Sequence, residues 1–329
     1  MNRICVLGSV NQDYVLSVTR HPAPGETLLG TELQLLSGGK GANQALLPAR
    51  FGARVQLIAC VGTDPAGDEL IDSLQLARVD TTYVTRIAGV RSGLAFITLA
   101  ADGENSIIVM PGANAHCDAT TVDAARDAIT SCDVLVVQLE IPVSAVERAA
   151  ALLAARPGTR VILNASPPRP LSPELLSRVD VLVVNEHEAA AICGQPTTTG
   201  LDGAAESVIA LLALGPAGAV VTCGAAGAVC GQTRDGEAVV THVAAPHVQP
   251  LDTTGAGDAF TGALAYELAD GRSFLDAIRF AVAVGAASTR VAGAQGEVSR
   301  TTVDELLAAT PPPRPIAAPR ASPSRDADC

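Results

Sequence analysis

The sequence is poor in aromatic residues and in basic residues. Among 329 residues it has no tryptophan, three tyrosines and five phenylalanines. Proteins that bind single-stranded nucleic acid stack bases on aromatic side chains, so this scarcity argues against that class. The formal net charge of −12 argues the same way, because an acidic chain repels phosphate backbones and anionic lipid. We expect no nucleic-acid partner and no membrane partner.

Several targeting and redox signals are also missing. None of the eight cysteines forms a C-x-x-C pair, and the first apolar run is too short for a secretory signal. The uncharged stretch at 207–233 could span a membrane by length, but Gly215-Pro216 interrupts it, so a helix followed by a strand fits better. These features predict a cytoplasmic protein with reduced thiols.

The common motifs of nucleotide-binding proteins and hydrolases are absent as well. The sequence contains no P-loop, no G-x-G-x-x-G fingerprint, no zinc signature and no G-x-S-x-G elbow. P-loop NTPases, simple dinucleotide enzymes, zincins and α/β-hydrolases are therefore poor candidates.

Short apolar runs alternate with helical patterns along most of the chain. Strands are expected at 3–8, 55–61, 134–138, 160–163, 181–184 and 219–222. Helices are expected at 41–51, 67–77, 121–129, 143–155, 186–192, 202–214, 256–269 and 274–291. Such alternation predicts an α/β fold with a doubly wound, mostly parallel sheet.

Two stretches break this rhythm. Segments 14–36 and 92–110 are strand-like, and a hairpin signal lies at 101–104, so we expect a small antiparallel sheet that forms a lid. Apolar residues recur along the lid at Leu94, Phe96, Ile107 and Val109, which predicts a homodimer formed through the lids. Residues 310–329 are rich in proline, so we expect a single domain over 1–309 and a disordered tail.

Polar residues follow several of the expected strands. Ligands of an open parallel sheet bind beyond the carboxyl ends of its strands. The residues in question are Asn11, Asp13, Glu140, Asn164, Asn185, Glu188, Gly224 and Gly227. Each also has a plain structural alternative as a helix cap or a turn residue. Lys40 is the only lysine beside 21 arginines, and its place between glycines suggests a site that needs a compact ammonium group.

The segment DTTGAGD at 252–258 precedes a long expected helix. Amides at a helix start can bind an anion, and Asp258 would lie in the first turn as a base for a hydroxyl proton. An ordinary glycine turn with a capping aspartate is the structural alternative. Together with GAL at 262–264, and with GGKGANQA at 38–45, this segment resembles the two signatures of the ribokinase (PfkB-type) family of sugar kinases. The similarity runs from Arg3 to about Leu307 and includes GSVNQD, QLE, NEHE, VTCGAAG and GAQ.

The resemblance implies a three-layer α/β body, a β-sheet lid, and ATP-dependent phosphorylation of a sugar hydroxymethyl group. It implies that the sugar is held by Asn11, Asp13, Gly39, Lys40, Asn43 and Glu140. It places ATP and Mg²⁺ at Asn185, Glu188, Thr222, Gly224 and Gly227. It makes Asp258 the base, Gly255, Ala256 and Gly257 the anion hole, and Asp252 and Thr254 a potassium site.

Within this family the pattern is most like the enzymes that phosphorylate D-ribose at its 5-hydroxyl. Deoxyribose, fructose or a nucleoside remain alternative substrates, and a non-catalytic sugar-binding regulator is a further alternative. The chain departs from the family pattern at Pro48, at Cys223 and at Glu297. Glu297 stands where the family commonly has serine, and the chain has one extra residue before Gly293. Glu297 could add charge to the potassium site or be moved out to solvent. We expect activation by potassium to be retained.

Overall fold

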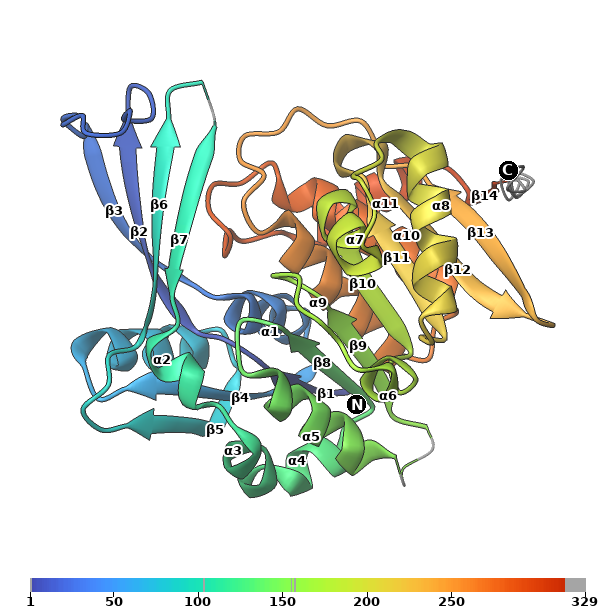
Figure 1. Cartoon of the computed structure of the whole chain (residues 1–329), viewed down its shortest axis with the longest axis horizontal. Coiled ribbons are helices and arrows are strands. Elements are labelled where there is room, and N and C mark those ends of the chain that lie inside the picture. The colour runs from blue at the N-terminus through green and yellow to red at the C-terminus, as the bar shows by residue number, and fades with distance from the viewer. Residues whose placement is uncertain (1, 103, 155, 157, 317–329) are drawn as a thin grey trace, which may run out of the picture.

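The computed structural model describes residues 2–316 except 103, 155 and 157. Within these residues, ten strands form one sheet, and helices cover both of its faces (Figure 1). In spatial order the strands are β14 (Arg314–Pro315), β13 (Glu237–Val243), β12 (Ala228–Arg234), β11 (Gly218–Thr222), β10 (Val181–Asn185), β9 (Arg160–Asn164), β8 (Val134–Gln138), β1 (Arg3–Leu7), β4 (Arg54–Gly62) and β5 (Asp80–Ile87). The strands from β11 to β5 are parallel, which confirms the doubly wound, mostly parallel sheet.

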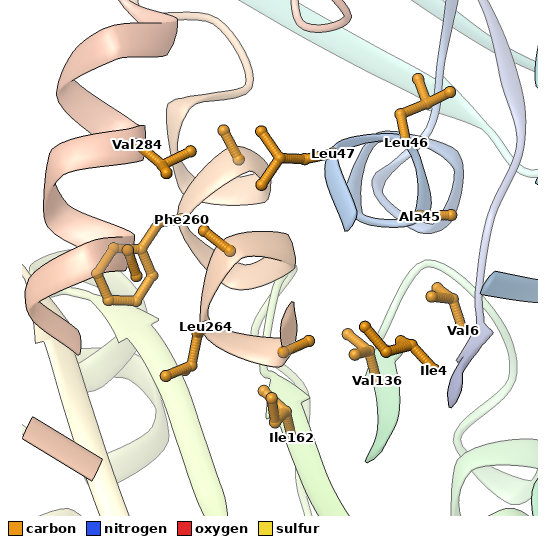
Figure 2. Packing of buried hydrophobic residues seen from close by; sticks show 14 of the residues in the cluster. Ile4, Val6, Ala45, Leu46, Leu47, Val136, Ile162, Phe260, Leu264 and Val284 are labelled. Carbon is orange, nitrogen blue, oxygen red and sulfur yellow. The ribbon is translucent and has the colours of Figure 1, made fainter. Parts of the chain in front are cut away.

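Successive side chains of the strands enter two separate apolar layers, because neighbouring residues of a strand point to opposite faces. In β1, Ile4 and Val6 face one layer, and Cys5 and Leu7 face the other. The first layer contains α1 (Lys40–Arg50), α2 (Pro65–Leu76), α9 (Ala256–Ala269), α10 (Phe274–Ser288) and α11 (Arg300–Ala309). The second contains α3 (Ala119–Ala124), α4 (Arg126–Ser131), α5 (Val143–Leu153), α6 (Pro173–Leu176), α7 (Glu186–Cys193) and α8 (Gly200–Ala213). Figure 2 shows the first layer, where side chains of α1 and α9 pack against those of the strands. The sheet with one helical layer on each face makes the body a three-layer fold.

A separate four-stranded sheet forms the lid and stands beside the body (Figure 1, upper left). Its spatial order is β3 (Glu32–Gly38), β2 (Asn11–Val18), β6 (Gly93–Ala100) and β7 (Asn105–Met110). The outer pairings are antiparallel as expected, but the central pairing of β2 with β6 is parallel. The expectation of a purely antiparallel lid is corrected here, because both central strands leave the body and run outward in the same direction.

The C-terminal end differs from expectation over its first residues. Disorder from Thr310 onward does not hold for 310–316, since Thr310 is buried and β14 pairs with β13. The amide of Ile316 also donates to the carbonyl of Val240 at 3.0 Å. These pairings cover the backbone edge of β13, which would otherwise be left unpaired. The rest of the expected tail, 317–329, lies outside the described residues.

Other local patterns are largely as expected. The uncharged run forms the end of α8, all of β11 and most of β12, and no helix among the described residues is long and apolar enough to cross a membrane. Helix α1 continues through Pro48, and the helix expected at 121–129 is instead divided at Ala125 into α3 and α4. Strands β5, β12, β13 and β14 and helices α6 and α11 were not predicted.

Candidate active site

The strand order reverses between β1 and β8. From this point the sheet continues to β4 and β5 on one side and to β9, β10 and β11 on the other. A crevice at such a switch point is the usual ligand site of an open α/β sheet. The predicted polar residues lie along this carboxyl edge, because each ends or follows one of these strands. They are Asn11 after β1, Glu140 after β8, Asn164 at the end of β9, Asn185 at the end of β10 and Thr222 at the end of β11.

The start of α1 packs against the segment that joins β1 to β2. Gly39 precedes the helix with φ of 90°, and a Cβ atom there would lie 2.7 Å from the amide nitrogen of Asn11. Only glycine permits this approach. The amide of Lys40 donates to Oε2 of Glu140 at 3.2 Å, and the hydroxyl of Ser9 donates to the same oxygen. Glu140 therefore holds the ends of β1 and β8 and the start of α1 together.

The Lys40 ammonium lies in an acidic cluster. Burial alone would lower the pKa of Lys40, but the charges of Asp258, Glu140 and Glu188 outweigh burial and raise it. The side chain is therefore a cation that three carboxylates stabilise.

Asp13 is the carboxylate of the lid that faces the body. Burial, with the nearby charges of Glu140 and Asp258, raises its pKa to about 7. Its Oδ1 atom is buried and has no hydrogen-bond donor among the described residues. A buried acceptor without a donor is costly unless a ligand supplies one. Asp13 is thus suited to bind hydroxyl groups.

Asn11 is held by a residue that the sequence reasoning missed. Asn114 lies in the 3₁₀ helix Gly112–His116 that follows β7, and its Nδ2 donates to Oδ1 of Asn11 at 2.7 Å. The side chain of Asn114 also bonds the amide and the carbonyl of Val10, at 3.0 and 3.2 Å. With its oxygen occupied in this way, Asn11 is left with its own amide donors for a ligand. The order PGAN directly after the expected hairpin is the only sequence signal that could have pointed to Asn114.

Asp258 lies in the first turn of α9 and is 7% exposed. Its Oδ2 accepts from Nδ2 of Asn43 at 3.0 Å, and its Oδ1 accepts from Nε2 of Gln44 at 2.8 Å. The two signature segments identified in the sequence therefore meet at this carboxylate. Asn43 also accepts from Gln295 at 2.9 Å, which links the third expected segment, GAQ, to the site.

The amides beside Asp258 form only part of the expected anion hole. The amide of Ala256 donates to the carbonyl of Thr253 at 3.2 Å and is occupied. Those of Gly255 and Gly257 donate to no acceptor among the described residues, so they are available at the helix start. The prediction for Ala256 is therefore weakened, because its N–H closes the turn instead.

On the expected nucleotide side, the structural alternative for Asn185 and Glu188 is realised. The two residues form a capping box at the start of α7, with both hydrogen bonds at 2.8 Å. The Thr222 hydroxyl donates to the carbonyl of Val184 at 3.3 Å. Gly224 and Gly227 form the tight turn between β11 and β12, where the Gly227 amide donates to the Gly224 carbonyl. The capping box uses one oxygen of Glu188 and leaves the other.

The expected potassium site is built around Asp252. Partial burial opposes ionisation, but hydrogen bonds from the amides of Thr254 and Gly293, at 2.9 and 2.8 Å, lower the pKa of Asp252 overall. Glu297 is exposed, and its charge acts on Arg50. Arg50 in turn donates to the carbonyls of residues 295 and 296. Of the two alternatives for Glu297, the structure therefore favours displacement toward solvent. No group of three or more histidines, cysteines or acidic residues that could hold a metal ion occurs in the described part of the chain.

The arrangement defines a class of protein: an α/β enzyme with a lid sheet beside the carboxyl edge of its main sheet, and with a buried carboxylate beside free amides at a helix start. Comparison with known proteins specifies this class further. Residues 1–301 match the model of the pfkB family carbohydrate kinases, and the chain belongs to this family. This confirms the resemblance seen in the signatures.

Individual relatives are similar over nearly their whole length. A ribokinase of Haemophilus influenzae is 38% identical over 295 residues, which cover 90% of this chain and 94% of that protein. A deoxyribokinase of Salmonella typhi is 33% identical, with 89% and 94% covered. Among solved structures, an Arabidopsis thaliana ribokinase complexed with ribose and ATP superposes with a TM-score of 0.84 at 32% identity, covering 93% of this chain and 99% of that one.

Proposed function

We propose that the protein transfers the γ-phosphoryl group of ATP to the 5-hydroxyl of D-ribose and so forms ribose 5-phosphate. Membership of the pfkB family supports a carbohydrate kinase, and the similarity to ribokinases over nearly their full length supports ribose. The observation that carries the proposal is the buried Asp258 carboxylate beside the free amides of Gly255 and Gly257.

In this reaction Asp258 accepts the proton of the 5-hydroxyl while the hydroxyl oxygen of the sugar attacks the γ-phosphorus of ATP. The bond from the γ-phosphorus to the bridging oxygen breaks, and ADP leaves. The amides of Gly255 and Gly257 stabilise the charge on the transferred group. Asp13 and Glu140 accept hydroxyl hydrogens of the sugar, Asn11 and Asn43 contribute amide groups, and Lys40 supplies a compact cation. The lid excludes water, so the phosphoryl group reaches the sugar rather than solvent.

The nucleotide and its ions would occupy the neighbouring part of the sheet edge. We assign ATP to the turn with Gly224 and Gly227 and to Thr222, and Mg²⁺ to the side of Asn185 and Glu188. The oxygen of Glu188 that the capping box leaves free suits a hard cation, which neutralises phosphate charge when bound. The ordered carboxylate of Asp252, with Thr254, suits a monovalent cation beside the anion loop.

Potassium activation can be tested separately from the reaction itself. We expect a higher kcat in potassium chloride than in an equal concentration of a bulky organic cation salt. Glu297→Ala should show the same activation, because Glu297 is exposed and faces Arg50. Equal rates in both salts would contradict the site at Asp252.

We further propose that the protein acts in the cytoplasm as a homodimer joined through the lids. The seven described cysteines are free thiols, which is consistent with a reducing compartment. On the lid face opposite Asp13, Leu33, Leu35 and Ile108 are 56%, 56% and 68% exposed. An apolar sheet face of this kind is typical of a protein contact.

The experiment that tests the reaction is ATP turnover against ribose, 2-deoxyribose, fructose and nucleosides, with Asp258→Asn as the matched inactive control. We expect ribose to give the highest kcat/KM. The deoxyribokinase relative makes 2-deoxyribose the second candidate. Asp258→Asn should lower kcat by about 100- to 10,000-fold, as the loss of a general base does. Turnover of none of these compounds, or an unimpaired Asp258→Asn variant, would overturn the proposal.

A further inference from the structure

Beneath Asp258 lies a row of buried amide side chains that have no part in the reaction described above. Gln44 comes from α1, Gln138 from β8 and Asn164 from β9, and they are 0%, 0% and 8% exposed. The residues on β8 and β9 are direct neighbours in the sheet register. Three uncharged amides at this depth need hydrogen-bond partners, so the direction of each bond is informative.

Gln44 uses both of its N–H donors and its oxygen in hydrogen bonds to this row and to Asp258. Its Nε2 donates to Asp258 at 2.8 Å and to Oδ1 of Asn164 at 2.9 Å, and its Oε1 accepts from Nε2 of Gln138 at 2.7 Å. A half-turn of the Gln44 amide would place its oxygen against the oxygens of Asp258 and Asn164, and its NH₂ against that of Gln138. The bond from Gln138 therefore fixes which end of Gln44 faces the carboxylate.

Gln138 holds the Gln44 amide in this orientation, while one of its own polar atoms is left without a hydrogen-bond partner. Its Oε1 is buried and has no donor among the described residues. A Cβ atom at Gly8 would lie 1.8 Å from this oxygen, so the glycine leaves the room that the side chain needs. Turning the Gln138 amide would bring its oxygen against Oε1 of Gln44. The unpaired oxygen is thus the consequence of directing the NH₂ group toward Gln44.

We propose that Gln44 and Gln138 are positioning residues that hold the Asp258 carboxylate in one orientation, an inference that rests on the proposed role of Asp258 as the base. A hydrogen bond donated to a carboxylate favours its charged form. Because the donors are neutral amides, they hold the carboxylate without cancelling its charge. Each oxygen of Asp258 accepts one amide bond and keeps further lone pairs for the hydroxyl proton.

The charged groups around Asp258 come from other elements and stay in place when the amides are changed. Lys40 of α1 and Asp13 of β2 both interact with its charge, and Glu140, after β8, acts on both of them. A pH profile of the variants therefore reports on the amide row against a constant charged background.

The test is the pH dependence of kcat with saturating ribose and ATP over about pH 5 to 9, because kcat reports groups of the bound complex. Gln44→Met keeps the length of the side chain and removes the donor. Gln138→Met removes only the bond that fixes Gln44. Val136→Ala, two residues earlier in β8 and part of the apolar core, is the matched control for lost stability.

For Gln44→Met we expect kcat at neutral pH to fall about 10- to 100-fold. The acidic limb of its kcat–pH profile, where kcat rises with pH, should move up by about one pH unit. The ribose KM should change less than about threefold. Gln138→Met should shift the limb in the same direction by less. Val136→Ala should lower Tm and leave the limb unchanged. Variants of Gln44 and Gln138 whose acidic limb stays at the wild-type pH would overturn the proposal, and if Gln44→Met does not fold, Gln138→Met decides by the same criterion.

A double variant separates this inference from the function beneath it. If Gln44 acts through Asp258 alone, adding Gln44→Met to Asp258→Asn should lower the residual rate less than twofold. A further 10-fold loss would show that Gln44 acts elsewhere and would refute the positioning role. Failure of the wild type to phosphorylate ribose, by contrast, would refute the proposed function and not the geometry of the amide row.

Discussion

Lys40 is the residue whose chemistry is most sharply marked in the sequence. The chain uses arginine at every other basic position, and the structure places this lysine among three carboxylates. A guanidinium is larger and planar, so it cannot replace a compact ammonium in a closed site. We expect Lys40→Arg to lower kcat/KM for ribose about 10- to 100-fold although the charge is kept. Arg54→Lys, at an exposed position at the start of β4, is the control and should leave kcat/KM unchanged.

Asp13 carries a pH dependence whose sign follows from its raised pKa. Its pKa is about 7 in the folded protein against 3.8 ordinarily, so above pH 7 the fold retains a carboxylate that burial and neighbouring charges disfavour. This destabilisation decreases as the pH falls from 7 toward 4 and vanishes below that, where the folded and unfolded forms are both protonated.

Asp13→Asn should therefore increase the free energy of unfolding at about pH 8, by up to about 4 kcal/mol, and change it little at about pH 4. Ribose binding should be weakened at both pH values. Denaturant unfolding curves at the two pH values measure the first effect, and calorimetric titration with ribose measures the second. An equal change in stability at both pH values would refute the raised pKa.

Among single residues, the sequence pointed to side chains that carry a charge or lie in a glycine-rich loop. It did not point to residues that only hold another site residue in place. Asp258, Lys40 and Glu140 stand out because a charge or a glycine-rich loop marks them. Ser9 and Asn114 carry no such mark, and their roles arise only where distant segments meet. The occupied amide of Ala256 could not be foreseen either, since it depends on how the turn closes onto Thr253.

At the scale of elements, the short helix after β7 joins the lid to the sugar site. Asn114 bonds both backbone groups of Val10 and the side chain of Asn11, so it ties the exit of β7 to the start of β2. Asn114→Ala should raise the ribose KM about tenfold and lower stability by about 1–3 kcal/mol. Steady-state kinetics and thermal unfolding measure the two effects.

Asn105→Ala is the control for Asn114, because Asn105 is an exposed amide at the other end of β7. It should leave the ribose KM and Tm near the wild-type values. An Asn114→Ala protein that binds ribose normally would show that the helix is only a connection between the lid and the body.

The parallel strands of the body were predictable because each is a short apolar run, buried on both faces, between helical patterns. The hairpin of β12 and β13 was missed because the unbroken uncharged run gives no alternation at its boundary. The pairing of β2 with β6 could not be predicted, since it joins segments separated by β3, α1, β4, α2 and β5. Local patterns predict elements, and contacts between distant segments need the three-dimensional fold.

For the whole molecule, the apolar outer face of the lid predicts a dimer in solution. Ile108→Asp places a charge on this face, in the edge strand β7, and should convert the protein to a monomer at micromolar concentration, which light scattering measures. Leu76→Asp is the control, because Leu76 is 86% exposed at the end of α2 and lies outside the lid. A wild-type protein with the mass of a monomer would contradict the proposed assembly.

The parallel pairing within the lid also has a consequence for how the chain folds. Strand β2 leaves the ribosome early, but its parallel partner β6 follows only after β3, α1, β4, α2 and β5 have been made. Closing a loop of this length is slow, and contacts of high sequence separation form late. The nascent chain therefore carries β2, with Asp13, paired along one edge only, with β3, until β6 has been made. The ribose pocket is completed last, and hydrogen exchange during refolding should protect the amides of β1 and β4 before those of β2 and β6.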